Sequence, residues 1–396
     1  MSTSVEPRDP SPSGTQPVPD QRATSLELFF DLVYVFAFTQ VTHLMAEGAS
    51  LTSVLGGVAV LGVLWWSWAS HAWLANQSPA DRGVARVGIL IAIAIAIVLV
   101  LSISIPEVYT GAGESRFGAM LFAVGFVLLS LAYTAVNVVV AGRDVPLRRQ
   151  VLRTMGVTIV PVSAALIVGA FLGGTAQLIL WLSAVAIEGL TVYLTSRNGR
   201  WQLPSAAHYA ERHGLVVILA LGESIISIGL GAAHVTLSPL VILGSLLAVA
   251  VALGMWWHYF DRLSADAEHR IDALAGTRRT AVATAGTYLH FGIVAGILFA
   301  SLGMGGAIEH IGEADQLGTF SAIAMTGGLA LFFASAAAYA WRTSSRLRWS
   351  GMVAAAIALA LTPALSVAPP VAAIGAVLLL TLGLNAYQRL RPRERT

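Results

Sequence analysis

The chain of 396 residues is 56% hydrophobic and only 11% charged, with a formal net charge of +2. A soluble globular protein has about 25% charged residues, so the composition excludes an ordinary soluble domain and favours a lipid-facing exterior. Cysteine is absent, which excludes disulfides, thiolate metal sites and cysteine nucleophiles.

The hydrophobic runs predict an all-α protein, a polytopic membrane helix bundle. Residues 1–22 are rich in proline and serine and have no hydrophobic run, so we expect a disordered cytoplasmic tail rather than a signal peptide. A helix needs about 20 mainly apolar residues to cross the hydrocarbon core. Runs of this kind predict about twelve transmembrane helices, near residues 25–45, 51–75, 83–105, 117–141, 149–172, 176–195, 206–231, 239–261, 279–303, 318–341, 349–366 and 370–388.

The arginines predict the orientation of these helices. Lysine is absent, and with the span count above every one of the 23 basic residues except Arg116 falls on the same side of the membrane as the two termini. Cytoplasmic loops of membrane proteins are enriched in Lys and Arg. We therefore expect an inner-membrane protein with both termini in the cytoplasm, the second being a short tail at 391–396.

Several pairs of features recur between the two halves of the chain. The only Trp-Trp pairs lie at 65–66 and 256–257, and Pro161 and Pro363 interrupt the fifth and eleventh runs. Six spans per half would give a parallel repeat of residues 23–200 and 201–390. Chance recurrence is the alternative. If the repeat is real, the matched prolines indicate a binding site near the bilayer midplane.

Two acidic residues lie in the first predicted helix. Asp31 is about 10 Å into the span, counted at 1.5 Å per residue from Thr24, and an unpaired charge there is costly. It is therefore protonated, paired or hydrated, and it serves either as a proton- or cation-binding group or as a structural ion pair. Glu27 lies one turn earlier on the same face, and the sequence from Thr24 to Glu27 also fits a capping box.

A second polar cluster opens the seventh predicted helix. It contains His208, Glu211, Arg212 and His213. Glu211 and Arg212 are adjacent in sequence and cannot face each other, so we predict that Arg212 pairs with an acidic residue, Asp31 or Glu27, of the first helix. Two histidines and a glutamate could also bind a metal ion, but their spacing matches no recognised ligand set.

Three further ionisable residues lie deep in predicted spans: Glu188 in the sixth, Glu223 in the seventh and His290 in the ninth. Apolar surroundings favour the protonated form of a carboxyl group, which is the property that a proton-coupled carrier needs. Burial without any function is the alternative for each of them.

Two motifs together resemble the bacterial low-temperature-requirement A (LtrA) family. The segment from Glu27 to Gln40 reads ELFFDLVYVFAFTQ and is similar to the opening motif of that family, and the segment from His208 to Ser224, HYAERHGLVVILALGES, resembles its second motif. The resemblance covers nearly the whole chain from about residue 22. It implies a multi-pass membrane protein linked by name to growth in the cold, and it brings no reaction, substrate or cofactor.

Three functions remain open at this stage. The first is a proton- or cation-coupled transporter whose path is lined by Asp31, Glu211, Arg212 and Glu223. The second is a membrane-embedded enzyme or cofactor protein with a cytoplasm-facing site, built from a set of four histidines: His71, His208, His213 and His258. The third is a non-catalytic cold- or membrane-stress protein.

The transporter is the function that we expect, and we assign no catalytic residue, cofactor or metal ligand, because the sequence contains no phosphate loop, zinc signature or nucleophile elbow. The dispersed arginines argue against nucleic-acid binding. The expected partners are the lipid bilayer and a small solute or ion, and a homo-oligomer is left open.

Overall fold

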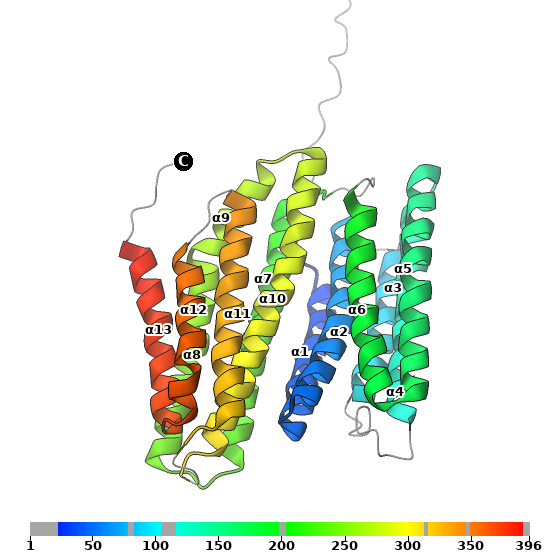
Figure 1. The fold of residues 1–396 in the computed structure, drawn as a ribbon. Helices are drawn as coiled ribbons and strands as arrows, with labels where there is room; N and C mark the ends of the chain where they lie inside the picture. The colour runs from blue at the N-terminus through cyan, green and yellow to red at the C-terminus, as the bar shows by residue number, and fades with distance from the viewer. Residues whose placement is uncertain are drawn as a thin grey trace, which may run out of the picture.

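The chain is a bundle of long helices that run side by side (Figure 1). The computed structural model describes residues 23–77, 83–103, 116–197, 203–312, 316–344 and 349–390. The predicted tails 1–22 and 391–396 lie outside the described residues. The first six helices are α1 (Ser25–Gly48), α2 (Leu51–Gln77), α3 (Gly83–Ile103), α4 (Phe117–Val140), α5 (Val145–Leu172) and α6 (Gly174–Arg197).

The second series also contains six long helices. They are α7 (Ala206–Ala233), α8 (Pro239–His258), α10 (Gly276–Glu309), α11 (Thr319–Ser344), α12 (Trp349–Ser366) and α13 (Pro370–Leu390). α8 continues through a π-helical turn, η2 (Tyr259–Leu263), into the short helix α9 (Ser264–Asp272). The predicted fold class is therefore confirmed, with helix ends mostly within a few residues of the predicted runs.

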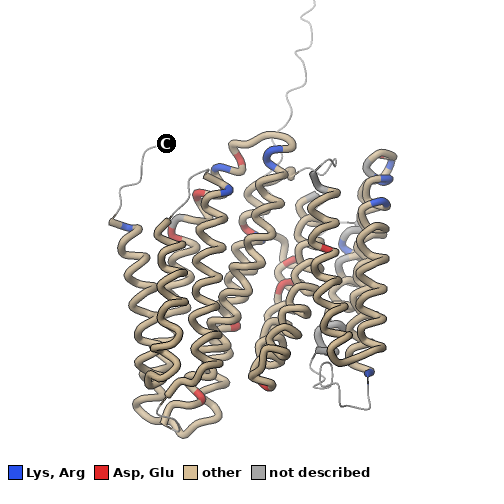
Figure 2. The backbone as a smooth tube through the Cα atoms, viewed as in Figure 1, with Lys and Arg blue, Asp and Glu red and all other residues tan. Residues whose placement is uncertain are grey.

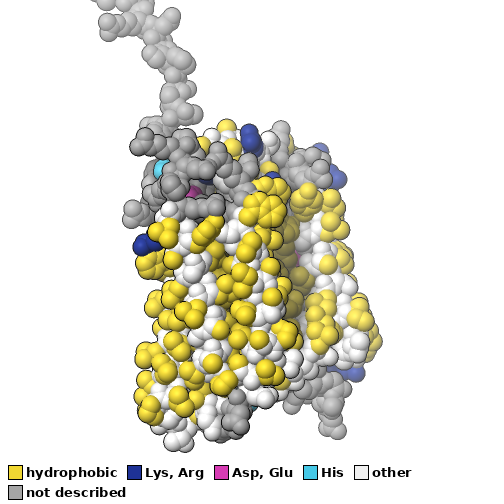
Figure 3. Space-filling view, turned by 60° about the vertical axis from the view of Figure 1, so that its left-hand side comes forward, with side chains coloured by type: hydrophobic (Ala, Val, Ile, Leu, Met, Phe, Trp, Pro, Cys, Tyr) yellow, Lys and Arg dark blue, Asp and Glu magenta, His cyan; other side chains and the backbone are white. Residues whose placement is uncertain are grey.

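Eleven helices of the described part of the chain are long and apolar enough to cross a membrane. The twelfth long helix, α3, contributes a shorter apolar stretch, Arg86–Ile97. Hydrophobic side chains cover much of the outer face seen in Figure 3. Leu32 of α1 is also 59% exposed. An exterior of this kind is stable against lipid and not against water.

The helices pack in the same pairs in each series. In the first, α1 contacts α2 and α3, α3 contacts α4, α4 contacts α5, and α6 contacts α5 and α2. In the second, α7 contacts α8 and α10, α10 contacts α11, α11 contacts α12, and α13 contacts α12 and α8. This recurrence agrees with a parallel six-plus-six repeat, which stays a prediction.

Most of the described arginines lie near one end of the bundle (Figure 2). The other end carries Arg116, which precedes α4 and lies 5.6 Å from the ring of Phe171 near the end of α5. The charge asymmetry read from the sequence is thus present in three dimensions. Which end faces the cytoplasm stays a prediction.

The core is thickest around α10, the longest helix, which packs closely against α11. A Cβ atom added at Gly296 of α10 would lie 2.8 Å from the carbonyl oxygen of Gly328 in α11. Glycine at both positions lets the two backbones approach, as small residues do in membrane helix pairs. α10 also contacts α1, α2, α6 and α7, so it positions side chains from both series around the polar cluster described next.

Candidate functional site

The start of α1 is fixed by the capping box that the sequence predicts. The Glu27 amide donates a hydrogen bond to the Thr24 hydroxyl at 3.3 Å, and the Thr24 amide donates to Oε2 of Glu27 at 3.2 Å. A capping box satisfies two amide groups that the helix itself leaves free. It also holds the Glu27 carboxyl group against the protein, where only 1% of the residue is exposed.

α1 and α7 lie side by side and run in the same direction. Three polar contacts join them: Glu27 to His208, Asp31 to Arg212, and Thr42 to Glu223, the partners in each being 181 residues apart. A constant difference in residue number means that the two helices are parallel and keep one register along their contact. The contact surface of α1 with α7 is therefore the interface between the two series of helices.

Arg212 forms the ion pair that the sequence predicts. Its Nη2 atom donates to Oδ1 of Asp31 at 2.8 Å, and its Nη1 atom lies 3.7 Å from Oε2 of Glu27. Trp68 of α2 donates its indole N–H to the same Oδ1 atom at 3.0 Å. Arg212 and Asp31 are 0% and 2% exposed, so the pair is shielded from lipid and water alike.

The side chain of Asn76 in α2 indicates which ring nitrogen of His208 carries a proton. Its amide is oriented by two backbone contacts with Ser205, because Oδ1 accepts from the amide N–H at 3.3 Å and Nδ2 donates to the carbonyl at 2.8 Å. Nδ2 therefore also faces Nδ1 of His208, at 3.3 Å, as a donor. Nδ1 must accept, so the proton is on Nε2, which donates to Glu27 Oε2 at 3.1 Å. The contacts of Asn76 therefore favour this tautomer of His208.

Several polar atoms of this cluster have no hydrogen-bond partner among the described residues. They are Oδ2 of Asp31, Nε and Nη1 of Arg212, and both ring nitrogens of His71, whose ring stacks 3.8 Å from that of Phe30. Buried polar atoms are normally satisfied by protein, water or a bound ion. The ion pair thus retains free donor and acceptor capacity in the interior of the bundle.

A second group of polar and aromatic side chains lies next to it, between α7 and α10. His213 donates from Nδ1 to the Tyr209 carbonyl at 2.9 Å, and its Nε2 atom lies 3.1 Å from the Thr287 hydroxyl. His290 is 4.8 Å from the His213 ring, and its Nε2 atom lies 2.8 Å from the Tyr259 hydroxyl. The structure therefore brings together two of the predicted histidines.

Glu223 lies deeper along the same interface, about 16 Å from the Arg212 pair at 1.5 Å per residue of helix. Its Oε1 atom accepts a hydrogen bond from the Thr42 hydroxyl at 2.7 Å, and the residue is 0% exposed. Its Oε2 atom has no hydrogen-bond partner in the described part of the chain. The hydroxyl groups of Thr42 and Ser301 are the polar neighbours of this buried carboxyl group.

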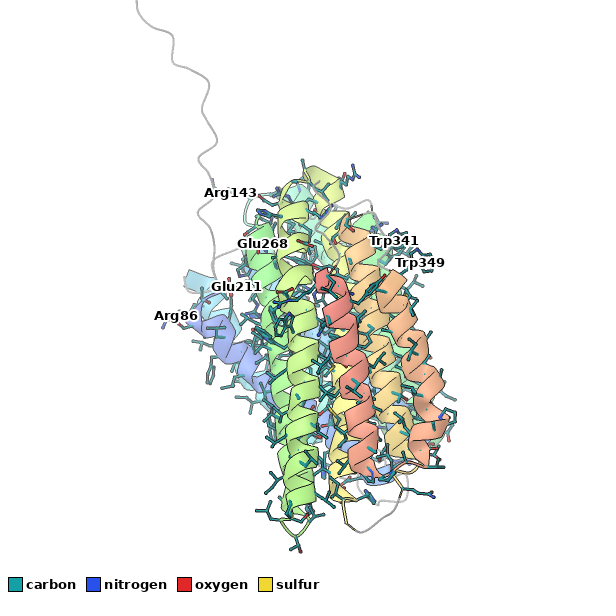
Figure 4. The ribbon with its side chains drawn as sticks, turned by 90° about the vertical axis from the view of Figure 1, so that its left-hand side faces the viewer. Arg86, Arg143, Glu211, Glu268, Trp341 and Trp349 are labelled. Atoms are coloured by element: carbon teal, nitrogen blue, oxygen red, sulfur yellow. The ribbon has the colours of Figure 1, made fainter. Side chains whose placement is uncertain are left out.

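Two other predicted residues lie outside the buried part of this interface. Glu211 is exposed and accepts a hydrogen bond from the backbone amide of Ala23 at 2.8 Å; Figure 4 shows it toward the end of the bundle where Arg86 and Arg143 lie. Glu188 is buried on α6, beside Tyr288 of α10. That Glu211 lines one path with Asp31 stays a prediction.

The comparisons with known proteins agree with the two sequence motifs. Residues 22–386 match the family model described as bacterial low temperature requirement A protein (LtrA). The chain belongs to the LtrA family. It is also similar to the uncharacterized protein RA0937 of Rhizobium meliloti (strain 1021), with 29% identity over 392 residues, covering 95% of this chain and 91% of that protein. No solved structure matches it.

In this LtrA protein the two motifs lie on α1 and α7 and face each other across the interface between the two series. Within the described residues, no group of three or more His, Asp or Glu side chains is placed to hold a metal ion. His258 instead contacts Asn385 of α13, with Nδ1 3.0 Å from Oδ1, while His208 contacts Glu27. The four histidines of the enzyme hypothesis are thus divided among separate contacts.

Sequence reasoning missed the residues that orient the predicted ones. Trp68, Asn76, Thr42 and Thr287 each bond a predicted site residue from another helix. Asparagine and tryptophan inside a hydrophobic run are a weak signal, because both are also common at the ends of membrane helices. Only the packing of α1, α2, α7 and α10 against one another gives them a partner.

Proposed function

We propose that this LtrA-family protein is a secondary transporter of the bacterial inner membrane, coupled to protons or another cation, with both termini in the cytoplasm. The observation that carries the proposal is the charge balance of the α1–α7 interface. Two buried carboxyl groups, of Glu27 and Asp31, share one guanidinium group, of Arg212. With both carboxyl groups ionised and His208 neutral, one negative charge would remain to be balanced by a proton or a metal cation.

The place of this charge supports a carrier rather than a structural ion pair. It lies at the contact between the two series of helices, where alternating-access carriers built from repeats bind their ions. Oδ2 of Asp31 has no partner among the described residues, so a proton or cation can bind there without breaking the pair. Pro161 and Pro363 lie inside α5 and α12, as the matched interruptions of such a carrier would.

Glu223 supports a path that continues across the bundle. It lies on the same face of α7 as Arg212 and also has one carboxyl oxygen without a partner in the described residues. Two buried carboxyl groups at different depths on one interface could hold the coupling ion in turn as the two series move. We propose no enzymatic reaction, since the sequence contains no phosphate loop, zinc signature or nucleophile elbow.

Proteoliposomes containing a pH-sensitive dye test this proposal. A panel of small organic cations, organic anions, amino acids and sugars is added outside, with and without a pH or sodium gradient. We expect at least one solute to drive ion flux, and we expect Asp31→Asn and Glu223→Gln to abolish the coupling. Glu268→Gln, at an exposed site in α9, is the matched control and should retain it. Absence of flux for every solute, or unchanged coupling in both variants, would reject the carrier.

A further inference from the structure

A cavity lies beside the polar cluster, on the side of the first series of helices. It has a volume of about 100 Å³ and is bounded by α2, α4, α5, α6 and α10. An engineered protein cavity of about 150 Å³ binds benzene, so this partly open space suits a molecule of a few heavy atoms. Nothing in the transport proposal above uses it.

Aromatic rings form one wall of this cavity. Trp66 and Trp73 come from α2 and Tyr288 from α10, and the rings of Trp66 and Tyr288 lie 4.8 Å apart at 67°. The polar atoms of two of these rings are already bonded, because Trp73 donates its N–H to Thr287 at 3.2 Å and Tyr288 donates its O–H to the Gly189 carbonyl at 2.6 Å. What they offer a ligand is therefore mainly the π-systems of their rings.

One ionisable group close to this wall is acidic. Glu188 lies one turn before Val192, a lining residue of α6, and interacts with Tyr288. It is 7% exposed, and its Oε2 atom has no hydrogen-bond partner among the described residues. The lining itself contains no arginine or histidine; its polar members are Ser70, Asn137, Thr154, Thr284 and Thr287.

We propose that the cavity between Trp66, Trp73 and Tyr288 binds a small organic cation of the alkylammonium class. A positive charge over the face of a tryptophan is attracted by the ring quadrupole, and quaternary ammonium groups are recognised by such aromatic surfaces. Glu188, one turn from the lining residue Val192 and beside Tyr288, is the acidic group that would balance the charge of the ligand once ionised. An anion would meet no cation there, and a neutral solute would leave the carboxyl group without a partner.

Contacts of Thr287 also link the cavity to the polar side chains around Arg212. The Thr287 hydroxyl lines it, accepts the N–H of Trp73 and contacts Nε2 of His213, the neighbour of Arg212 in α7. A ligand that displaces Trp73 or Thr287 must therefore change a contact of α7 with α10. As a substrate assignment this inference rests on the proposed transport function, whereas ligand binding itself does not.

Isothermal titration of the purified full-length protein with choline tests the proposal. The neutral isostere 3,3-dimethyl-1-butanol, which has carbon in place of nitrogen, is titrated in parallel. We expect saturable binding of choline and at least tenfold weaker binding of the alcohol. We expect Trp66→Leu to weaken choline binding about fivefold or more, Trp66→Phe to restore much of it, and Glu188→Gln to weaken it at least tenfold. Trp256→Leu, at an exposed site on α8, is the matched control and should bind as the wild type does.

Equal affinity for choline and the alcohol, or no saturable choline binding by the wild type, would overturn the proposal. The proposal would also be overturned if the Trp66→Leu variant bound choline as tightly as the Trp256→Leu variant does. Each variant is first checked for a single size-exclusion peak and a wild-type melting temperature, and Trp66→Phe serves where Trp66→Leu fails that check. Choline binding without ion-coupled flux would reject the transporter and keep the site. Asp31-dependent flux of another solute without choline binding would reject the choline site and support the transporter.

Discussion

At the scale of single residues, Arg212 holds the α1–α7 interface together. It is fully buried and bonds Asp31, and it is the cation next to Glu27. Replacing it by methionine leaves two carboxyl groups in the interior without a cation. Removing one partner of a buried pair costs about 3–5 kcal/mol, so we expect Arg212→Met to lower the melting temperature strongly. Thermal unfolding in detergent, followed by tryptophan fluorescence, measures this.

The double variant Arg212→Met/Asp31→Leu separates lost packing from unpaired charge. It removes both members of the pair, so we expect it to be more stable than Arg212→Met alone. If the two variants melt together, Asp31 contributes nothing to the cost and the ion pair is not the reason for the effect. Arg212→Lys should fall between the wild type and Arg212→Met, because lysine keeps the charge and loses the planar fork.

His208 gives a second prediction at this scale. The Asn76 amide, fixed by the Ser205 backbone, presents a donor to Nδ1 of His208. We expect a neutral imidazole with its proton on Nε2. Nitrogen NMR of protein labelled at histidine distinguishes this form from the cation and from the other tautomer, and His208→Gln assigns the signal. A cationic signal at neutral pH would contradict the charge balance on which the transport proposal rests.

At the scale of helices, the close approach of α10 and α11 depends on glycine. Gly296→Ala places a methyl group 2.8 Å from the Gly328 carbonyl oxygen, and overpacking of this kind costs about 1–3 kcal/mol. The matched change Gly327→Ala meets no atom within 4 Å, and alanine is the better helix former. We expect the first variant to melt below the wild type and the second at or above it. Equal melting temperatures would show that the two helices can separate at no cost.

The helices and their order could be predicted from the sequence because each span carries its own signal. The apolar runs gave α1 to α7 and α11 to α13 to within a few residues. The run predicted at 279–303 belongs to the longer α10, Gly276–Glu309, which continues through Gly305 and Gly306 although glycine is a poor helix former. The continuation of α8 through η2 into α9 could not be predicted, because a π-helical turn has no simple sequence signature.

The site could be predicted only in part, for a related reason. A buried arginine and a buried aspartate in different spans each require a partner of opposite charge, which predicts that Asp31 pairs with Arg212. Asn76, Thr42 and Thr287 are common in membrane helices, and nothing in their own segments shows what they face. The exposure of Glu211 could not be predicted, because a simple helical projection places Glu211 on one face with His208. In the structure the carboxyl group of Glu211 bonds the chain just before α1.

At the scale of the whole molecule, the absence of cysteine makes the orientation directly testable. Three helices, α5, α6 and α7, separate Arg143 from Leu237, which is 73% exposed in the turn before α8. An odd number of spans places these two residues on opposite sides of the membrane. Because the arginine-rich end should face the cytoplasm, we expect a membrane-impermeant maleimide to label Leu237→Cys in intact spheroplasts and Arg143→Cys only after lysis.

The wild-type chain, which the maleimide cannot label, is the control for background. The reverse labelling pattern would mean that the same helix bundle has the opposite orientation in the membrane. The shared charge of Glu27 and Asp31 would then lie toward the periplasm. Since protons usually enter a bacterial cell down their gradient, inversion would make that pair the entry site of the coupling ion rather than its exit. Labelling of both positions in intact spheroplasts would instead contradict the three spans between them. The orientation therefore determines the order in which Glu223 and Asp31 would meet an incoming proton.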